Sequence, residues 1–246
     1  MPYVSRRRQS REQYIMNFKQ NTKEQTVMKI SPSLMCVDLM DLKNQLLFLN
    51  DHADMYHVDI MDLHFVPNIT LSSDFIKAIK PVAKLPIDAH LMTDKPELMT
   101  ELCAKAGADW ISPHVEAING IAYRLFDRIE KLGCTCGLAI NPETPVCDYE
   151  MYLDRVHKLT VMTVDPGFSG SAFIPEMLPK ISALAELKAK KGYDYIIEID
   201  GSCNEAHAKM LKDAGAEMMV IGTSGLFGLD PDLGTAWNRM QEYLAG

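Results

Sequence analysis

The stretch Lys105-Ala-Gly-Ala-Asp109 ends one helix-like segment and opens a strand-like segment. A near copy, Asp213-Ala-Gly-Ala-Glu217, does the same later in the chain. Glycine directly after the last helical residue is typical of a helix end. Because the same turn twice joins the same two kinds of segment, we expect both stretches to belong to equivalent β/α units.

Strand-like and helix-like segments alternate from Lys29 to the end of the chain, as judged from hydrophobic periodicity. The predicted strands cover residues 29–33, 54–61, 86–92, 108–113, 135–140, 158–164, 195–200 and 217–221. The predicted helices cover residues 38–50, 72–80, 96–106, 117–132, 146–153, 176–191, 204–214 and 232–244. Eight such units predict a single (β/α)8 TIM barrel over residues 28–246. A doubly wound open sheet is the alternative, because alternation alone does not establish that the sheet closes.

The composition limits the class of protein. The chain has 246 residues, a hydrophobic content of 47% and a formal net charge of −8. This length and apolar content suit one large domain with a full core. The negative charge argues against a nucleic-acid-binding protein, and no apolar run is long enough for a membrane-spanning helix. We therefore expect neither a nucleic acid nor a membrane as a partner.

The cysteines bear on the compartment. Six of them lie at positions 36, 103, 134, 136, 147 and 203, and only positions 134 and 136 are close in sequence. A chain of this length forms a core without disulfides, so we interpret the thiols as reduced and mainly structural. This interpretation favours a cytoplasmic protein.

Residues 1–27 differ in composition from the rest of the chain. They hold six basic and two acidic residues, which gives a net charge of +4, and they lack the apolar segment of a secretory signal. Met28 stands directly before the first predicted strand. We interpret residues 1–27 as a basic, disordered N-terminal extension or a misassigned start, with an organellar presequence as the alternative.

Two predicted strands carry polar side chains with a period of two. In His57-Val-Asp59-Ile-Met61 and in Asp88-Ala-His90-Leu-Met92, the histidine and the methionine share one face. A third predicted strand places Glu198 and Asp200 on one face by the same rule. The active sites of TIM barrels lie at the carboxyl ends of the strands, which is where these residues fall.

The residue types at these strand ends indicate a metal site. The candidate ligands of a divalent ion are His57, Asp59, His90 and Asp200. Imidazole and carboxylate groups are common ligands of such ions. Asp59 and Asp200 come from separate strands, so they also suit an acid/base pair beside a carbonyl. His114 and Glu116 follow the fourth predicted strand, where they either support this site or belong to a loop surface.

Three glycine-bearing loops follow the sixth, seventh and eighth predicted strands. They read Asp165-Pro-Gly-Phe-Ser-Gly170, Gly201-Ser-Cys-Asn204 and Gly222-Thr-Ser-Gly225. Small residues let backbone N–H groups approach an anion, and TIM barrels commonly bind phosphate after strands seven and eight. We therefore expect a small-molecule substrate with a terminal phosphate.

Six motifs follow one another in the order of a known family. They are Ile30-Ser-Pro-Ser33, His57-Val-Asp-Ile-Met-Asp62, His64-Phe-Val-Pro-Asn68, Asp88-Ala-His-Leu-Met92, Met162-Thr-Val-Asp-Pro-Gly-Phe168 and Glu198-Ile-Asp-Gly201. Over residues 28–246 the chain thus resembles the ribulose-phosphate 3-epimerase family, which implies a TIM barrel of the ribulose-phosphate-binding type. Three shorter matches resemble its D-allulose-6-phosphate 3-epimerase branch, namely Ser33-Leu-Met-Cys36, Asp200-Gly-Ser-Cys-Asn204 and Gly222-Thr-Ser-Gly-Leu-Phe227.

The resemblance implies roles for particular residues. It implies one divalent cation per subunit (zinc, iron, manganese or cobalt, with magnesium as a further option), held by His57, Asp59, His90 and Asp200. It implies that Asp59 and Asp200 are also the catalytic proton carriers. The implied substrate contacts are Ser33, the methionine floor of Met61, Met92 and Met162, and the phosphate-binding residues Gly167, Phe168, Ser169, Gly170, Gly201, Ser202, Gly222, Thr223 and Ser224.

The implied reaction inverts C3 of a ketose phosphate. The cation stabilises an enediolate, one aspartate removes the C3 proton, and the other returns a proton to the opposite face. We expect the conversion of D-allulose 6-phosphate to D-fructose 6-phosphate, with D-ribulose 5-phosphate as the alternative substrate. The resemblance also implies a homodimer or a higher homo-oligomer.

Leu63 departs from the family pattern, which usually has glycine at this position. If the position takes a positive φ, leucine costs roughly 1 kcal/mol or more there. We expect this departure to affect efficiency more than the kind of reaction, because the candidate metal and acid/base residues are all present.

Two other functions are weighed against an epimerase. A phosphosugar decarboxylase or a Schiff-base aldolase needs an inward lysine at the end of a strand. We expect no such inward lysine in the strand segments around Asp59, His90, Met162 and Asp200. A non-catalytic phosphosugar-binding barrel is the alternative from another class, and the presence of the full candidate ligand set argues against it.

Overall fold

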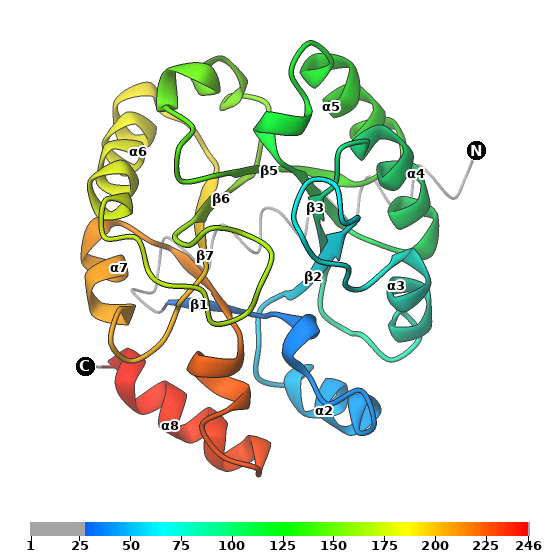
Figure 1. Cartoon of the computed structure of the whole chain (residues 1–246), viewed down its shortest axis with the longest axis vertical. Coiled ribbons are helices and arrows are strands. Elements are labelled where there is room, and N and C mark those ends of the chain that lie inside the picture. Colours follow the sequence, from blue (N-terminus) through cyan, green and yellow to red (C-terminus); the bar gives the residue numbers. More distant parts are fainter. Residues whose placement is uncertain (1–27, 246) are drawn as a thin grey trace.

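The computed structural model describes residues 28–245, so the predicted extension over residues 1–27 lies outside the described part of the chain. Eight parallel strands line the centre, and helices surround them (Figure 1). The strands are β1 (Lys29–Pro32), β2 (Tyr56–Met61), β3 (Ile87–Met92), β4 (Trp110–Pro113), β5 (Thr135–Ile140), β6 (Lys158–Met162), β7 (Ile196–Asp200) and β8 (Met218–Ile221). The helices of the described residues are α2 (Leu42–Leu49), α3 (Ser73–Ile79), α4 (Pro96–Ala106), α5 (Ala122–Lys131), α6 (Met177–Lys191), α7 (Ala208–Ala214) and α8 (Leu233–Ala245).

The sheet closes into a barrel. Its strand order is β1-β8-β7-β6-β5-β4-β3-β2, and β1 pairs with β8 from Lys29 opposite Met218 onward. The remaining gap between β1 and β2 is bridged by a parallel pairing of Ser33 with His57. The predicted TIM barrel is therefore confirmed, and the open-sheet alternative is excluded.

The two glycines of the repeated turn have the same conformation. Gly107 ends α4 with φ 114° and Gly215 ends α7 with φ 112°, both in the left-handed region that favours glycine. At Gly215 the turn also packs closely, because an added Cβ would lie 2.8 Å from the Cβ of Ala185. The two stretches are therefore structurally equivalent, as their sequences predict.

The acidic residue of each repeated turn accepts a hydrogen bond from the backbone of the preceding strand of the barrel. Asp109 Oδ2 accepts the backbone N–H of Ile87 at 3.0 Å, at the start of β3. Glu217 Oε2 accepts the backbone N–H of Ile197 at 2.8 Å, near the start of β7. These N–H groups lie at strand starts, and a carboxylate partner satisfies them where no ladder bond is available. The acidic residue thus has the same structural task in both copies.

One predicted helix takes a different form. Residues 146–153 form two short 3₁₀ turns, Val146–Asp148 and Glu150–Tyr152, in place of an α-helix. Tyr149 separates them with φ −130°, a non-helical value, and its side chain is fully buried in the core. The predicted helix is therefore interrupted at this buried residue. The helix predicted over 117–132 is shorter in the structure, because Val115–Ala117 forms a separate 3₁₀ turn and the α-helix begins only at Ala122.

The core has the two layers expected of this fold. Apolar side chains of the strands and of the inner helix faces form one large cluster between the barrel and the helical ring. Inside the barrel, several polar and charged side chains are buried, and these prepare the site described below. Among the helices of residues 28–245, none combines the length and the apolar character needed to cross a membrane.

Candidate active site

The candidate metal ligands converge at the carboxyl ends of three strands. His57 and Asp59 lie on β2, His90 on β3 and Asp200 at the end of β7. Asp59 pairs in register with His90, which places their side chains next to each other on the inner face. The period of two therefore brings together the residues that it predicts to meet.

The four side chains present two nitrogens and two oxygens to one point. His57 Nε2 lies 3.0 Å from His90 Nδ1, 3.2 Å from Asp59 Oδ1 and 3.4 Å from Asp200 Oδ2. His90 Nδ1 lies 3.2 Å from Asp59 Oδ1 and 3.4 Å from Asp200 Oδ2. All four ligand atoms lie within 4.8 Å of one another. Such a mixed imidazole and carboxylate set suits a divalent cation, so the residues present fit the implied metal ion.

The charge state of the two carboxylates is set by the neighbouring imidazoles. Burial alone would raise the pKa of Asp59, but His57 and His90 outweigh it and hold this pKa well below its usual range. The pKa of Asp200 is also lowered, because hydrogen bonds from the same histidines outweigh its burial. Both aspartates are therefore kept ionised, which is the form that binds a cation and accepts a proton.

A buried ion group lies beneath His57. His57 Nδ1 lies 3.4 Å from Asp88 Oδ2, and Lys158 Nζ lies 2.6 Å from the same oxygen. Lys158 also contacts Glu198 Oε1, and none of the three charged side chains is exposed. With Nε2 turned toward the other donors, His57 presents Nδ1 to a carboxylate, the arrangement typical of metal-binding histidines.

Lys158 corrects an expectation from the sequence. No inward lysine was expected around Met162, yet Lys158 lies on the same strand, β6, and points into the barrel, because residues four apart share a face. Lys158 begins the strand, however, whereas the pocket opens at the strand's other end, and Asp88 and Glu198 neutralise its ammonium group. A charged lysine held in this way is not a nucleophile, so the structure still argues against an imine-forming aldolase.

His114 and Glu116 support the site from the side of His90. His114 Nε2 lies 2.8 Å from His90 Nε2, and His114 Nδ1 lies 3.2 Å from Glu116 Oε2. The His114 side chain is fully buried, and this burial lowers its pKa to about 4. The sequence alone does not decide whether these two residues support the site or lie on a loop surface. The spacing does point to the site, because His114 follows β4 two residues after the buried Ser112 and so shares its inward face.

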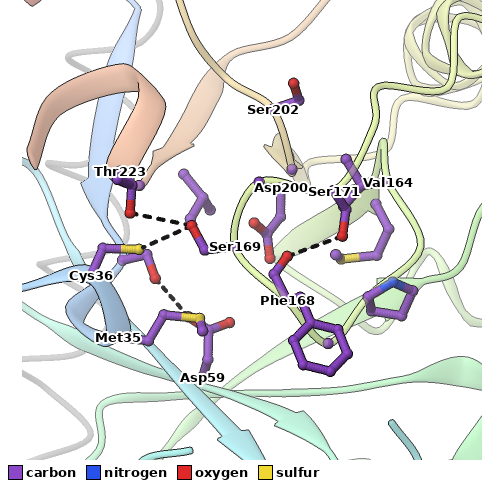
Figure 2. A pocket seen from close by; sticks show the side chains of 18 of the residues that line it. Met35, Cys36, Asp59, Val164, Phe168, Ser169, Ser171, Asp200, Ser202 and Thr223 are labelled. Carbon is purple, nitrogen blue, oxygen red and sulfur yellow. Dashed lines mark hydrogen bonds between the residues drawn. The ribbon is translucent and has the colours of Figure 1, made fainter. Parts of the chain in front are cut away.

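A pocket opens above the four donors. Its lining includes all of the predicted substrate contacts: Ser33, Met61, Met92, Met162, Gly167, Phe168, Ser169, Gly170, Gly201, Ser202, Gly222, Thr223 and Ser224. It also includes residues that the sequence does not single out as substrate contacts: Met35, Cys36, Val164, Pro166, Ser171, Cys203 and Val220. Figure 2 shows the carboxylates of Asp59 and Asp200 reaching the pocket from different strands.

The glycine-bearing loops meet on one side of the pocket. Ser169 donates a hydrogen bond of 3.2 Å to Thr223 Oγ1, and the thiol of Cys36 lies 3.8 Å from Ser169 Oγ (Figure 2). Asn204 Nδ2 lies 3.3 Å from Ser224 Oγ. The loops after β6, β7 and β8 therefore form one small-residue surface, as expected for an anion-binding site.

Leu63 adopts a positive φ, the case in which leucine in place of the family's usual glycine costs free energy. Its φ is 63°, in the left-handed region, and its side chain is 56% exposed. The loop is nevertheless well held, because Asp62 Oδ1 accepts the backbone N–H groups of His64 and Phe65, each at 2.9 Å. The strain at Leu63 thus lies in a loop that leaves β2 directly after the candidate ligands.

Solved structures agree with the architecture. A crystal structure of KGPDC from Streptococcus mutans superposes with a TM-score of 0.68 at 12% identity and covers 90% of this chain and 98% of its own. The tryptophan synthase subunit alpha from Legionella pneumophila gives a TM-score of 0.61 at 14% identity, with 94% and 98% covered. At these identities the likeness shows the fold alone. Fold and site together define a TIM-barrel protein with a candidate metal and acid/base centre.

Sequence relatives narrow this class. Residues 29–227 match the ribulose-phosphate 3 epimerase family. The ribulose-phosphate 3-epimerase of Bacillus subtilis is 38% identical over 200 residues, which is 80% of this chain and 92% of the relative. That of Methanocaldococcus jannaschii is 36% identical over 217 residues, 88% and 91% of the two chains. The chloroplastic ribulose-5-phosphate-3-epimerase of Arabidopsis thaliana is 39% identical over 201 residues, 81% and 71%. The chain belongs to the ribulose-phosphate 3-epimerase family, and the prediction of an isomerase is confirmed at that level.

Proposed function

We propose that this protein is a metal-dependent 3-epimerase of a ketose phosphate. The observation that carries the proposal is the convergence of His57 Nε2, His90 Nδ1 and the carboxylates of Asp59 and Asp200 within 4.8 Å. Membership of the family supports the reaction type, and the pocket above the donors supports a small phosphorylated substrate.

One divalent cation per subunit fits the four donors. His57 Nε2, Asp59 Oδ1, His90 Nδ1 and Asp200 Oδ2 would hold it. When bound, such an ion supplies Lewis-acid stabilisation to the enediolate that forms beside a ketose carbonyl. The donor types suit zinc, iron, manganese or cobalt, and magnesium to a lesser degree.

Asp59 and Asp200 are placed to move the C3 proton. They come from β2 and β7, which are separated in the ring by β1 and β8. The hydroxyl of Ser33 donates a 2.7 Å hydrogen bond to Asp59 Oδ2, which fixes the orientation of that carboxylate. One aspartate removes the proton from one face of the substrate, and the other returns a proton to the opposite face. Two acids on two strands invert C3 without any rotation of the substrate.

The pocket walls serve substrate binding. The side chains of Met61, Met92 and Met162 are buried around the floor, where apolar sulfur groups keep water away from the reacting carbons. The small residues of the loops after β6, β7 and β8 would hold the phosphate through backbone N–H groups. These roles are part of the proposal.

Two substrates compete within this reaction. The named relatives favour D-ribulose 5-phosphate, because each is called a ribulose-phosphate 3-epimerase. The loop elements that contain Cys36, Asn204 and Gly222–Phe227 favour D-allulose 6-phosphate, and all three border the side of the pocket that would hold the phosphate. We propose D-allulose 6-phosphate as the substrate to test first against D-ribulose 5-phosphate.

The oligomeric state and the cellular location of the protein are proposed from its sequence. We propose a homo-oligomer, following the resemblance, and a cytoplasmic location, following the cysteine usage. Neither a nucleic acid nor a membrane is proposed as a partner, in keeping with the acidic composition.

Proton exchange at C3 tests the proposed function directly. The measurement follows by NMR the exchange of this proton in heavy water, with each of the two sugar phosphates, before and after chelation and after return of a divalent ion. Exchange that stops on chelation and resumes with metal supports a metal-dependent epimerase, and the faster substrate identifies the branch. A protein that binds metal but exchanges neither substrate would be the non-catalytic sugar-phosphate-binding barrel.

A further inference from the structure

The rings of His90 and His114 form a buried pair behind the four donors. Their Nε2 atoms lie 2.8 Å apart, and the rings stack with centroids 4.9 Å apart and planes 20° apart. Neither side chain is exposed. Two nitrogens this close need one proton between them, because two protons would repel each other and two lone pairs would do the same.

The position of that proton follows from the candidate metal ligands next to His90. His90 Nδ1 faces His57, Asp59 and Asp200, so it is the nitrogen that a bound cation would use. A nitrogen that binds a cation carries no proton. The proton of a neutral His90 is then on Nε2, and His90 donates to His114.

The hydrogen bond between His114 and Glu116 fits the same proton positions. If His114 Nε2 accepts the proton from His90, a neutral His114 carries its own proton on Nδ1. That nitrogen lies 3.2 Å from Glu116 Oε2, a carboxylate oxygen that can only accept. Glu116 is itself held in place, because its other oxygen, Oε1, accepts the backbone N–H of Asn141 at 2.9 Å and the hydroxyl of Thr144.

We propose that His114 and Glu116 are positioning residues that set the tautomer of His90, so that its Nδ1 lone pair faces the cation. The inference rests on the proposed metal site. It differs from the support of His57, because Asp88 approaches that ring directly, whereas Glu116 acts on His90 through a second imidazole. Partners of metal-binding histidines typically contribute about 10- to 100-fold in metal affinity.

Glu116→Gln separates this role from a simple structural one. The amide oxygen can still accept from Asn141 and Thr144, so the loop after β5 stays anchored. The amide nitrogen then faces His114 Nδ1 and donates to it, which moves the His114 proton to Nε2. Two N–H groups would then point at each other between His114 and His90. His90 must turn or change tautomer, and either change withdraws Nδ1 from the cation.

Thr144→Val is the matched control. It removes the hydroxyl that Thr144 donates to Glu116 but leaves the contacts between Glu116, His114 and His90 in place. If Glu116 serves only to anchor the loop, Glu116→Gln should bind zinc as the wild type does, because its amide oxygen keeps both anchoring contacts. If it sets the tautomer, only Glu116→Gln should affect the metal.

The experiment is a calorimetric titration of zinc into the chelated, full-length protein and both variants. We expect Glu116→Gln to weaken zinc binding about 10- to 100-fold, with Thr144→Val unchanged. Equal affinity in the wild type and Glu116→Gln, or equal loss in both variants, would overturn the inference. Wild-type protein that takes up no zinc, cobalt or manganese would instead overturn the proposed function, and the inference with it.

A second measurement on the wild type does not depend on the folding of a variant. The ring ¹⁵N shifts of the zinc-loaded protein, read by NMR, give the tautomer of each histidine. We expect a protonated Nδ1 on His114 and a protonated Nε2 on His90. A protonated Nε2 on His114 would overturn the inference even if the protein binds zinc and epimerises its substrate.

Discussion

Lys158 Nζ lies 2.6 Å from Asp88 Oδ2 in the interior of the barrel, and neither side chain reaches solvent. Glu198 contacts the same ammonium group, so one lysine pairs with two buried carboxylates. Because Asp88 is also the carboxylate nearest to His57 Nδ1, at 3.4 Å, this ion group supports one of the candidate metal ligands from below. The stability of the barrel and the geometry of the site therefore share these residues.

Lys158→Met should destabilise the protein strongly. The substitution keeps most of the side-chain volume but removes the ammonium group that contacts the buried carboxylates of Asp88 and Glu198. Removing one partner of a buried ion pair typically costs about 3–5 kcal/mol. Urea denaturation of wild type and variant at neutral pH measures the difference in the free energy of unfolding.

The surface pair of Lys84 and Asp51 provides the control for this prediction. Their charged atoms lie 3.5 Å apart, but the side chains are 66% and 70% exposed. Lys84→Met should therefore change the free energy of unfolding by less than about 0.5 kcal/mol. Equal losses in the two variants would show that burial is not what makes the Lys158 pair important.

In acid, the free energy of unfolding should decrease as the pH falls, and part of this decrease should come from Asp88. Burial alone would raise the pKa of this carboxyl, but Lys158 and His57 outweigh it and hold the pKa well below its ordinary value of 3.8. A group whose folded-state pKa is depressed contributes stability that is complete above its unfolded value and is lost as the pH falls below that value. The stability gap between wild type and Asp88→Asn should thus narrow from about pH 5 to about pH 3. A gap that stays constant over this range would contradict the assignment.

The strands and the four donors could be predicted because their signals are local. Residues two apart on a strand share a face, and parallel strands end at the same edge of the barrel. His57 and Asp59 on one strand and His90 on the next therefore had to meet near Asp200. The boundaries of β5 and α4 agree with the sequence to the residue for a similar reason, since glycines precede or follow them.

The parts that the sequence did not reveal depend on contacts between distant strands. The inward direction of Lys158 was contained in the strand period, since Met162 lies four residues later, and the expectation of no inward lysine was wrong. Its partners Asp88 and Glu198, however, come from β3 and β7 and reach it only when the barrel closes. His114 is similar, because its ring stacks on the His90 ring of the neighbouring strand only when the barrel forms.

Asp59→Asn and Asp200→Asn should each abolish epimerisation while the barrel stays folded. Each substitution removes a charged donor from the candidate metal site and a carboxylate that would transfer a proton. The loss of proton transfer alone lowers rates about 10²- to 10⁴-fold. The rate at which one epimer is converted into the other, followed by NMR, measures epimerisation, and far-ultraviolet circular dichroism checks the fold.

Asp74→Asn is a control for these two variants, because Asp74 lies exposed on α3. It makes the same chemical change outside the pocket and should leave the rate of epimerisation unchanged. Near-normal conversion of one epimer into the other by either Asp59→Asn or Asp200→Asn would refute the two-aspartate mechanism.

Leu63→Gly should leave the protein equally stable or make it more stable. Leu63 has φ 63°, where an L-residue costs about 1–2 kcal/mol. Glycine removes that cost but adds about 0.4–1 kcal/mol of backbone entropy in the unfolded chain. Since the leucine side chain is 56% exposed, little packing is lost. The two backbone effects nearly cancel or favour glycine.

Leu39→Gly is the control for this prediction. Leu39 is 60% exposed and lacks a positive φ, so only the entropic cost remains, and Leu39→Gly should lower the free energy of unfolding. If both variants lose the same stability in urea denaturation, the backbone at Leu63 is not strained.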